Sequence, residues 1–479
     1  RDRDVTGAEY IDIKDDYVIR LQLFRKSNVN YMAWVYGKKR AYVMTDKAET
    51  FFRSFKLTPP KKKEAESFTF TDSVMAITFR APAKLELNEK LTKQSNDQDK
   101  WDVTFYTGQE QNSGAYIMLV SKQVKASNYI MSDSLILDEL YNIYKEKYKA
   151  DKKWGQINGY KAITLDGLVE NYSMKLFSFV RGNKNIALMV ISQRDKEDTA
   201  LQQMFNSLQL LPYKDAPWLD RGVPKATYSV VVPGPIRPLE KQYTSHQQKS
   251  YSYSFDTFST TSYFITTDTL SKYAWVTNDS VFLDRKLREL MEEDDSIIYQ
   301  KMTRNGFIVS QDILLSKRHS NTCQRIRMIP YGNILYTLSA GGDKFVLLGP
   351  DAKQFFGKFT PLYMAPTDIH EHKGAKLLAD LESKDSVVRH DAYMSIENQF
   401  WEKADIPMLH AALFKKYPRL YSWDDGTNVN FSIGRAILNL KDSTTLQYVK
   451  ENYRGLNGEN EVQKYTALEM PVSYTHLRA

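Results

Sequence analysis

The chain has 479 residues, which at about 150 residues per domain predicts about three domains. Its formal net charge of +8, with 26% charged and 13% aromatic residues, is ordinary for a globular protein and excludes collagen-like, mucin-like and wholly disordered chains. The single cysteine, Cys323, excludes an internal disulfide framework and a multi-cysteine zinc site, and no apolar run of about 18 residues predicts a membrane span.

A short pattern recurs along the chain at a spacing of about 150 residues. The stretch 133–138, Asp-Ser-Leu-Ile-Leu-Asp, returns at 279–284 as Asp-Ser-Val-Phe-Leu-Asp, and Asn-Gly-Tyr at 158–160 returns at 305–307 as Asn-Gly-Phe. Each unit closes on an aromatic-rich segment, at 51–57, 204–210 and 355–359. Because these anchors keep the same order, we interpret the chain as tandem copies of one unit.

Each unit carries a predicted hairpin. In the first, the strand at 19–23 alternates apolar and polar residues, and the chain turns at 26–28 and returns at 31–36. The same pattern predicts hairpins whose turns lie at 181–184 and 330–333. Amphipathic helices are predicted over 135–148 and 283–291, and further strands over 74–79, 103–106 and 115–121. Hairpin connections imply antiparallel pairing, and we expect the helices to lie against one face of the sheet.

This order of elements resembles the PsbP-like group. The complete units share an opening strand that ends near a proline (Pro82 and Pro233), a central amphipathic helix, a Gly-aromatic strand, the hairpin and an aromatic-ended closing helix. The resemblance covers about 67–362 together with a half-unit at 1–57. It implies compact antiparallel sheets flanked by helices, which act as binding modules without catalytic residues, and it places no binding residue on this sequence.

After Pro366 the apolar period becomes helical. The leucines of 377–381 close one predicted helix, Asp385 or Ser386 caps the next, and Ala392 is small enough for close helix packing, a pattern that resembles a HEAT repeat. Further helices are predicted over 406–417 and 429–440, and a third pair from Asp442 onward. The HEAT resemblance implies a surface that binds other proteins.

The predicted fold class is therefore α+β, with tandem antiparallel-sheet modules flanked by helices and a C-terminal all-α HEAT-like solenoid segment. We expect the chain to be a fragment cut at both ends. The predicted divisions are the C-terminal half of a truncated module at 1–57, a linker at 58–66, a complete module at 67–212, a linker at 213–224, a second complete module at 225–362, HEAT-like repeats at 363–470 and a non-native tail at 471–479.

Few ionisable residues have the spacing of a chemical site. His370 and His372, close to Asp368, would offer imidazoles to a metal, but the helical His-Glu-x-x-His spacing is missing. Cys323 is either a nucleophile or, as we favour, a buried thiol at the start of a strand. The acids of 292–295 favour a solvated helix end. Packing, surface or linker roles are predicted for His246, His319, His390, His410, the tyrosines of 251–263 and the lysines of 61–63. No catalytic, cofactor-binding or metal-binding residue is predicted.

The sequence therefore favours a non-catalytic interaction or scaffold protein that binds protein or peptide partners through its modules and helical repeats. Two alternatives stay open: a hydrolase-like enzyme with an unrecognised acid–base site on the α+β modules, and a nucleic-acid-binding protein. Interspersed charges disfavour a dedicated nucleic-acid groove. Abundant Tyr, Ser, Thr and Asn with one cysteine suit a periplasmic or envelope-associated bacterial protein. The oligomeric state is not predicted.

Overall fold

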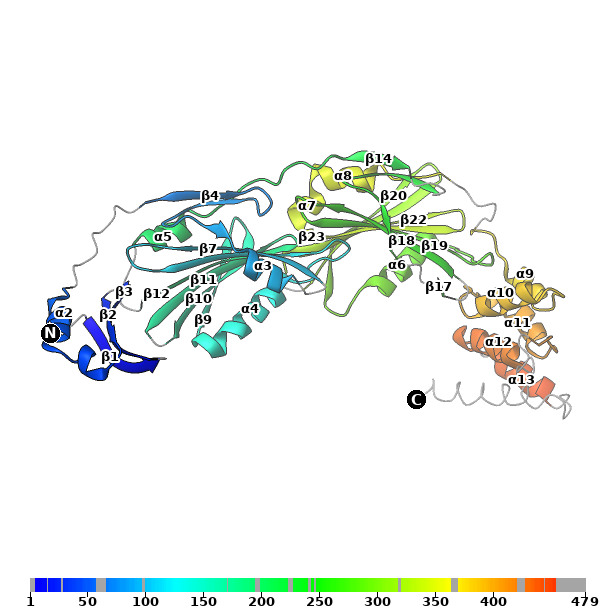
Figure 1. Ribbon diagram of the computed structural model, residues 1–479. Coiled ribbons are helices and arrows are strands. Elements are labelled where there is room, and N and C mark those ends of the chain that lie inside the picture. Colours follow the sequence, from blue (N-terminus) through cyan, green and yellow to red (C-terminus); the bar gives the residue numbers. More distant parts are fainter. Residues whose placement is uncertain are drawn as a thin grey trace. The chain divides into compact units, whose positions relative to one another are not determined.

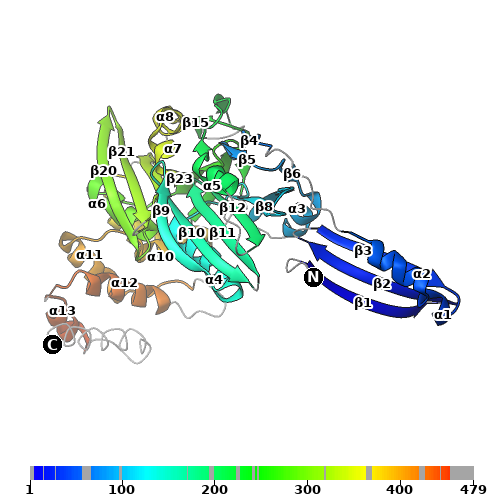
Figure 2. The same ribbon diagram turned by 90° about the vertical axis from the view of Figure 1, so that its left-hand side faces the viewer.

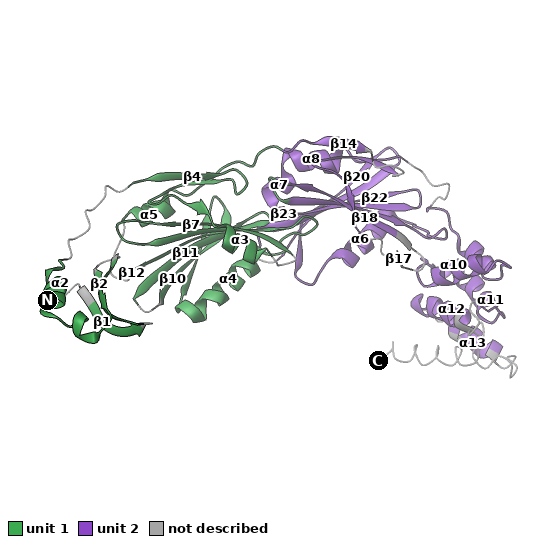
Figure 3. Cartoon of the chain, viewed as in Figure 1, with its two compact units in different colours: residues 1–215, 257–260 green, residues 216–256, 261–479 purple. Residues whose placement is uncertain are grey.

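The computed structural model describes residues 5–14, 16–26, 29–56, 66–96, 100–169, 171–193, 199–222, 227–239, 243–244, 247–317, 320–362, 369–419, 427–442 and 444–453. It shows a mixed α+β protein with several antiparallel sheets (Figure 1). The chain divides into two compact units, residues 1–215 with 257–260 and residues 216–256 with 261–479 (Figure 3). None of the helices within the described ranges has both the length and the hydropathy of a membrane span.

Residues 5–54 form a small sheet with helices on one face (Figure 2). Its antiparallel order is β1 (Val5–Lys14), β2 (Tyr17–Lys26), β3 (Val29–Gly37), which confirms the first predicted hairpin. Helices α1 (Arg40–Val43) and α2 (Asp46–Ser54) follow. Buried Arg20 of β2 pairs with Glu9 at 2.5 Å and with Glu49 of α2 at 2.6 Å, and its guanidinium lies over the Phe52 ring. These contacts fix α2 on the face of β2 that carries Arg20.

The large sheet of the first unit has the antiparallel strand order β6-β7-β8-β12-β11-β10-β9. The bounds are β6 (Glu86–Leu87), β7 (Trp101–Gln109), β8 (Tyr116–Val124), β9 (Asp151–Ile157), β10 (Tyr160–Val169), β11 (Tyr172–Arg181) and β12 (Lys184–Gln193). A small sheet of order β13-β5-β4 accompanies it, with β4 (Phe68–Asp72), β5 (Ile77–Ala81) and β13 (Gln209–Leu210). The helices are α3 (Glu89–Ser95), α4 (Asp133–Tyr148) and α5 (Thr199–Asn206).

The strand predicted over 74–79 is wrong in its first half. The Asp72 carboxylate accepts the N–H groups of Val74 at 2.8 Å and Met75 at 2.7 Å, and Ala76 has a left-handed φ of 54°. An aspartate that binds the backbone two and three residues ahead makes a turn. The strand β5 therefore begins only at Ile77.

Both faces of the large sheet are covered, which corrects the prediction that the helices cover one face. On one face Leu137 of α4 packs into a core with Leu176 and Met189. On the other face Ile77 of the small sheet and Met204 of α5 pack into a second core with residues of the same large sheet. The small sheet was missed because strands of two to five residues carry almost no periodic signal.

The large sheet of the second unit has the order β16-β18-β19-β23-β22-β21-β20, which matches the first unit position by position. The strand β17 (Tyr243–Thr244) pairs with β18, and a small sheet has the order β14-β15-β24. The bounds are β14 (Leu219–Gly222), β15 (Tyr228–Val232), β16 (Arg237–Pro238), β18 (Gln247–Asp256), β19 (Thr261–Thr269), β20 (Asp295–Asn305), β21 (Ile308–Lys317), β22 (Thr322–Tyr331), β23 (Ile334–Asp343) and β24 (Thr360–Pro361), with helices α6 (Asp279–Leu290), α7 (Lys344–Leu348) and α8 (Pro350–Gly357).

Two features of the second unit bear on the predicted elements. The strand β14 lies inside 213–224, which was predicted to be a linker because of its prolines; a short strand can lie between prolines when it is paired on one side. Helix α6 packs Leu283 and Leu287 into one core, and α8 packs Phe355 and Phe356 into another. The predicted amphipathic helix and the aromatic closing helix are therefore confirmed.

A helical segment follows within the second unit. Its elements are α9 (Gly374–Asp380), α10 (Ser386–Ile396), η1 (Lys403–Asp405), α11 (Ile406–Leu413), α12 (Thr427–Asn439) and α13 (Thr444–Tyr453). Helix α9 packs against α10, α11 against α12 and α13, and α10 against α12. Asp385 caps α10 by accepting the N–H of Val387 at 2.8 Å, and Ala392 is fully buried, as predicted. The expected helices beyond 453 and the tail 471–479 lie outside the described residues.

The helical segment is attached to the second sheet by the loop between β19 and α6. Tyr273 of this loop lies in the helical core, and its hydroxyl donates to Asp380 at 2.7 Å. Ser271 and Ser395 share a hydrogen bond of 2.7 Å. A Cβ on Gly374 would lie 2.8 Å from the Trp401 ring, so only glycine permits this close packing. The segment is thus joined to the sheet by both apolar and polar contacts.

Candidate functional site

The two histidines considered as metal ligands bind different protein partners. The Nδ1 atom of His370 lies 3.0 Å from the carbonyl oxygen of Val276, and Nε2 of His372 lies 2.8 Å from the Asp405 carboxylate. The His372 ring also meets Trp275 edge to face. Asp368 lies outside the described residues. Among the residues that the structure describes, no group of three or more His, Cys, Asp or Glu side chains could hold a metal ion. These imidazoles join the segment before α9 to the β19–α6 loop and to η1.

The other acid and thiol candidates also have structural surroundings. Cys323 of β22 is buried in the apolar core beneath α8, as favoured from its position at the start of a strand. Glu292 and Asp295 both bind the Lys317 ammonium, at 2.5 Å and 3.1 Å. The Asp295 carboxylate also accepts the N–H of Glu292 at 2.8 Å. A lysine thus bridges this acidic turn to β21, rather than the turn being a simple solvated helix end.

The structure describes some of the remaining sequence candidates, and the others lie outside the described residues. Tyr263 is fully buried in the second-unit core, in line with the packing role predicted for the tyrosines of 251–263. His390 lies on α10 and is half-buried. His410 of α11 is buried, with Nε2 3.0 Å from the Thr445 hydroxyl and its ring stacked on Tyr448. His246, His319 and the lysines of 61–63 lie outside the described residues.

The burial of His410 predicts a pH-dependent stability of the helical segment. Burial lowers the pKa of His410 below its ordinary value of 6.5, against a smaller opposing effect of Asp442. The unfolded chain then takes up the proton first, so stability is retained above about pH 6.5 and falls as the pH falls below it. We expect the melting temperature at pH 5.5 to lie below that at pH 7.5, by a smaller margin in His410→Phe. Equal margins in the two proteins would show that His410 does not titrate on unfolding.

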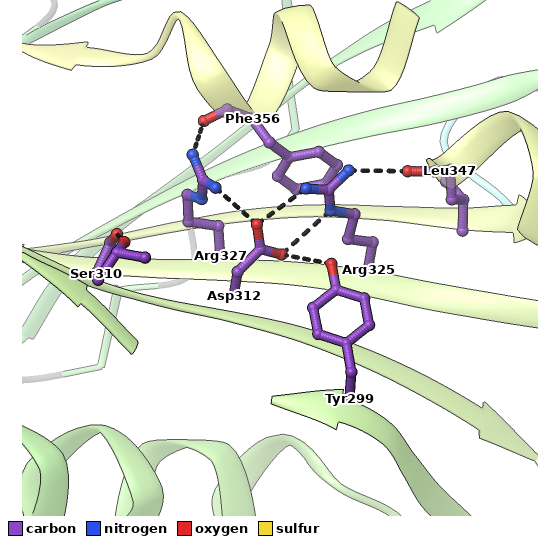
Figure 4. A network of polar contacts seen from close by, with 8 residues as sticks. Tyr299, Ser310, Asp312, Arg325, Arg327, Leu347 and Phe356 are labelled. Atoms are coloured by element: carbon purple, nitrogen blue, oxygen red, sulfur yellow. Dashed lines mark hydrogen bonds and ion pairs between the residues drawn. The ribbon is translucent and has the colours of Figure 1, made fainter. Parts of the chain in front are cut away.

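A buried ionic network on the second large sheet was not predicted from the sequence (Figure 4). Asp312 of β21 accepts from Arg325 of β22 at 2.9 Å, from Arg327 at 2.6 Å and from the Tyr299 hydroxyl of β20 at 3.1 Å. The two arginines also donate to helix carbonyls, Arg325 to Leu347 at 2.9 Å and Arg327 to that of Phe356. The network therefore joins three strands to the ends of α7 and α8.

The carboxylate of this network is held in its charged form. Burial alone would raise the pKa of Asp312, but the guanidiniums of Arg325 and Arg327 hold it below its ordinary value. The carboxylate is therefore ionised, and both of its oxygens are engaged. Cations beside the last carbonyls of a helix also complement its dipole. Arg325 and Arg327 alternate with apolar residues along β22, and α7 and α8 cover the side of the sheet on which the two arginines lie.

The first sheet exposes an apolar face opposite α2. Tyr10, Leu21 and Trp34 are paired neighbours across β1, β2 and β3, and Ile19 is paired with Tyr36. Tyr10, Trp34 and Tyr36 are 56%, 51% and 65% exposed. We call this surface the first-sheet face; it comprises Tyr10, Tyr17, Ile19, Leu21, Leu23, Met32, Trp34 and Tyr36. Large exposed apolar patches on a folded protein mark interaction sites.

The same face of the first large sheet is covered by a helix. The strands β2 and β11 begin at residues 17 and 172, and the strands β3 and β12 begin at residues 29 and 184. Both strands of the first hairpin are therefore separated from their counterparts by the same number of residues. By that spacing Leu21 corresponds to Leu176, and Trp34 corresponds to Met189. Leu21 is paired with Trp34 across the first hairpin, and Leu176 is paired with Met189 across the second. Leu176 and Met189 are at most 4% exposed, because α4 packs on them. The first-sheet face has the pattern of a surface that a helix covers.

No protein family and no curated protein sequence matches the chain. Among solved structures, it matches one titled "Crystal structure of MucB in complex with MucA(peri)". The match has 9% identity, covers 55% of this chain and 89% of that chain, and has a TM-score of 0.15. At this TM-score the match supports no statement about the function of the chain.

Proposed function

We propose that the chain is a non-catalytic interaction protein, built from tandem PsbP-like α+β modules and a HEAT-like helical segment, that binds protein partners. The identical strand orders of the two large sheets support a tandem copy of one module. The paired helices α9–α10 and α11–α12 support the helical-repeat interpretation. The acids and histidines considered above as site residues bind other protein groups, and we assign them structural roles.

The exposed first-sheet face carries this proposal. The structure that fits it is an amphipathic α-helix, whose apolar stripe packs across Leu21 and Trp34 as α4 packs across Leu176 and Met189. An apolar groove or face that binds such a helix contacts the apolar side chains at positions i, i+3, i+4 and i+7 of the helix. Helix α4 supplies Leu137, Leu140 and Tyr144 at this spacing to its own sheet.

Selection from a phage-displayed library of amphipathic helices tests the proposal. We expect the selected peptides to share the helical apolar spacing and to bind Trp34→Asp about tenfold or more weakly, since a tryptophan at the centre of an interface often contributes more than about 1.4 kcal/mol. The matched control is Tyr42→Asp, which alters an equally exposed aromatic on α1 and should leave the dissociation constant unchanged. Selected peptides without helical spacing, or equal losses in both variants, would contradict the proposal.

A further inference from the structure

The strand β3 lies at one edge of the first sheet and, within the part of the chain that the structure describes, is paired with β2 alone (Figure 2). Strands that end a sheet are usually protected from further pairing by charged side chains or proline. The sheet-ending strands β9 and β20 follow this rule, with Lys152 and Lys153 in β9 and Lys301 and Arg304 in β20. The strand β3 (Val29–Gly37) has neither a charged residue nor a proline. We call its outer side the β3 edge.

The strands equivalent to β3 in the two large sheets are paired on both sides. In the first large sheet β12 pairs antiparallel with β8 along 184–191, and in the second β23 pairs antiparallel with β19 along 334–341. Trp34 of β3 corresponds to Met189 of β12, which lies opposite Met118 of β8. The repeats therefore identify what fits the β3 edge, which is an antiparallel strand of about eight residues.

In both units the strand on this edge leads into the helix that covers the sheet. The strand β8 is followed, after residues 125–132, by α4, and β19 is followed, after residues 270–278, by α6. Helix α4 packs on the face that corresponds to the first-sheet face, and α6 packs on its own large sheet. One strand–loop–helix segment thus fills the edge and the adjoining face of each large sheet, whereas the described first sheet leaves both open.

We propose that the first sheet binds a strand–loop–helix segment of a partner protein, whose strand pairs antiparallel with β3 and whose helix packs on the first-sheet face. In such strand addition, main-chain hydrogen bonds give affinity and alternate side chains give specificity. A second copy of this chain would have to unfold to supply its own segment, because its β8 is paired on both sides and its Leu137 is fully buried. The inference rests on the proposed function, to which it adds the β3 edge.

The repeat also indicates which backbone groups of the added strand face the β3 edge. At the end of the β8–β12 ladder the Val124 N–H donates to the Asn183 carbonyl at 3.1 Å. The hydrogen-bonding direction alternates along an antiparallel strand, so Val120 also directs its N–H toward β12 and Leu119 directs its N–H away. A strand added to β3 in the same way has this alternation.

The probe is a synthetic peptide with the sequence of residues 116–148, which carries β8 and α4, added to the full-length chain. We expect it to bind, and we expect N-methylation at Val120 to weaken binding about tenfold or more, because the methyl group removes a hydrogen bond and blocks strand approach. The matched control is N-methylation at Leu119, which should change the dissociation constant less than about twofold. Fluorescence polarisation measures both. Equal losses at the two positions, or no binding, would overturn strand addition.

Proline at position 32 tests the same contact from the side of β3. By the constant spacing Met32 corresponds to Ala187, which lies opposite Val120, so its N–H faces the β3 edge. Proline is tolerated in an edge strand where the N–H faces solvent, so the sheet should keep its fold. Met32→Pro should bind the peptide at least about tenfold more weakly than Met32→Ala, which loses the same side chain but keeps the N–H.

Failure of strand addition can be distinguished from failure of the proposed function. If helical peptides bound in a Trp34-dependent way while the 116–148 peptide tolerated both N-methylation and Met32→Pro, strand addition would be overturned and the protein-binding function would stand. A wild-type dimer that Met32→Pro dissociates, measured by sedimentation velocity, would assign the β3 edge to a second copy and overturn the partner segment. No binding by either kind of peptide would overturn both proposals.

Discussion

Replacing Asp312 by alanine is expected to destabilise the second unit by about 3–5 kcal/mol, because it leaves two buried guanidiniums without their counter-charge. Arg325 and Arg327 both bind this carboxylate, and both reach helix ends through their other nitrogens. Without it, the two cations that contact the ends of α7 and α8 repel each other. Urea unfolding, with hydrogen exchange of β21 to β23 as the local probe, measures the loss.

The control for Asp312 replaces the whole network with apolar side chains. The triple variant Asp312→Leu, Arg325→Met, Arg327→Met should recover most of the lost stability, since buried ion networks are often replaceable by apolar residues of similar volume. If the free energy of unfolding of Asp312→Ala lay within about 1 kcal/mol of that of the wild type, the network would be weakly coupled to the fold. A triple variant no more stable than the single would show that the charges themselves are needed.

Truncation at equivalent positions of the two repeats should unfold one sheet without the other. Leu137 of α4 and Leu283 of α6 occupy the same place in the repeated motif, and both are fully buried in the core between helix and sheet. Leu137→Ala and Leu283→Ala are each expected to cost about 2–5 kcal/mol. Hydrogen exchange should increase in β10 to β12 for the first variant and in β21 to β23 for the second.

The motif also supplies matched controls on the same helices. Leu135 and Val281 are equivalent to each other and are 63% and 56% exposed. Their replacement by alanine should change stability by about 0.5 kcal/mol or less. If either core variant increased exchange in both large sheets alike, the two sheets would form one cooperative unit, against the proposed modules.

The hairpins and capped helices could be predicted because their signals are local. Turn residues such as Gly182 and Gly332 adopt positive φ where each hairpin reverses, and Asp385 caps the helix that it precedes. The repeat spacing also located α4 and α6, since equivalent stretches fold alike. These features depend on residues a few positions apart.

The missed features depend on partners distant in the sequence. Strands of two residues, such as β13 and β24, are defined only by pairing with β5 and β15. The burial of Arg325 depends on α7, which begins about twenty residues later and covers it. The exposure of the first-sheet face could not be predicted, because its strands alternate apolar and polar residues in the same way as strands that a helix covers.

Photo-crosslinking at the first-sheet face tests the protein-binding account most directly. A benzoylphenylalanine residue would replace Trp34 in one protein and Tyr42 in another, and each would be irradiated with a selected helical peptide. The account predicts crosslinks from position 34 that fall on one stripe of the peptide, three or four residues apart, and few from position 42. Crosslinks spread evenly along the peptide, or equal yields from both positions, would contradict it.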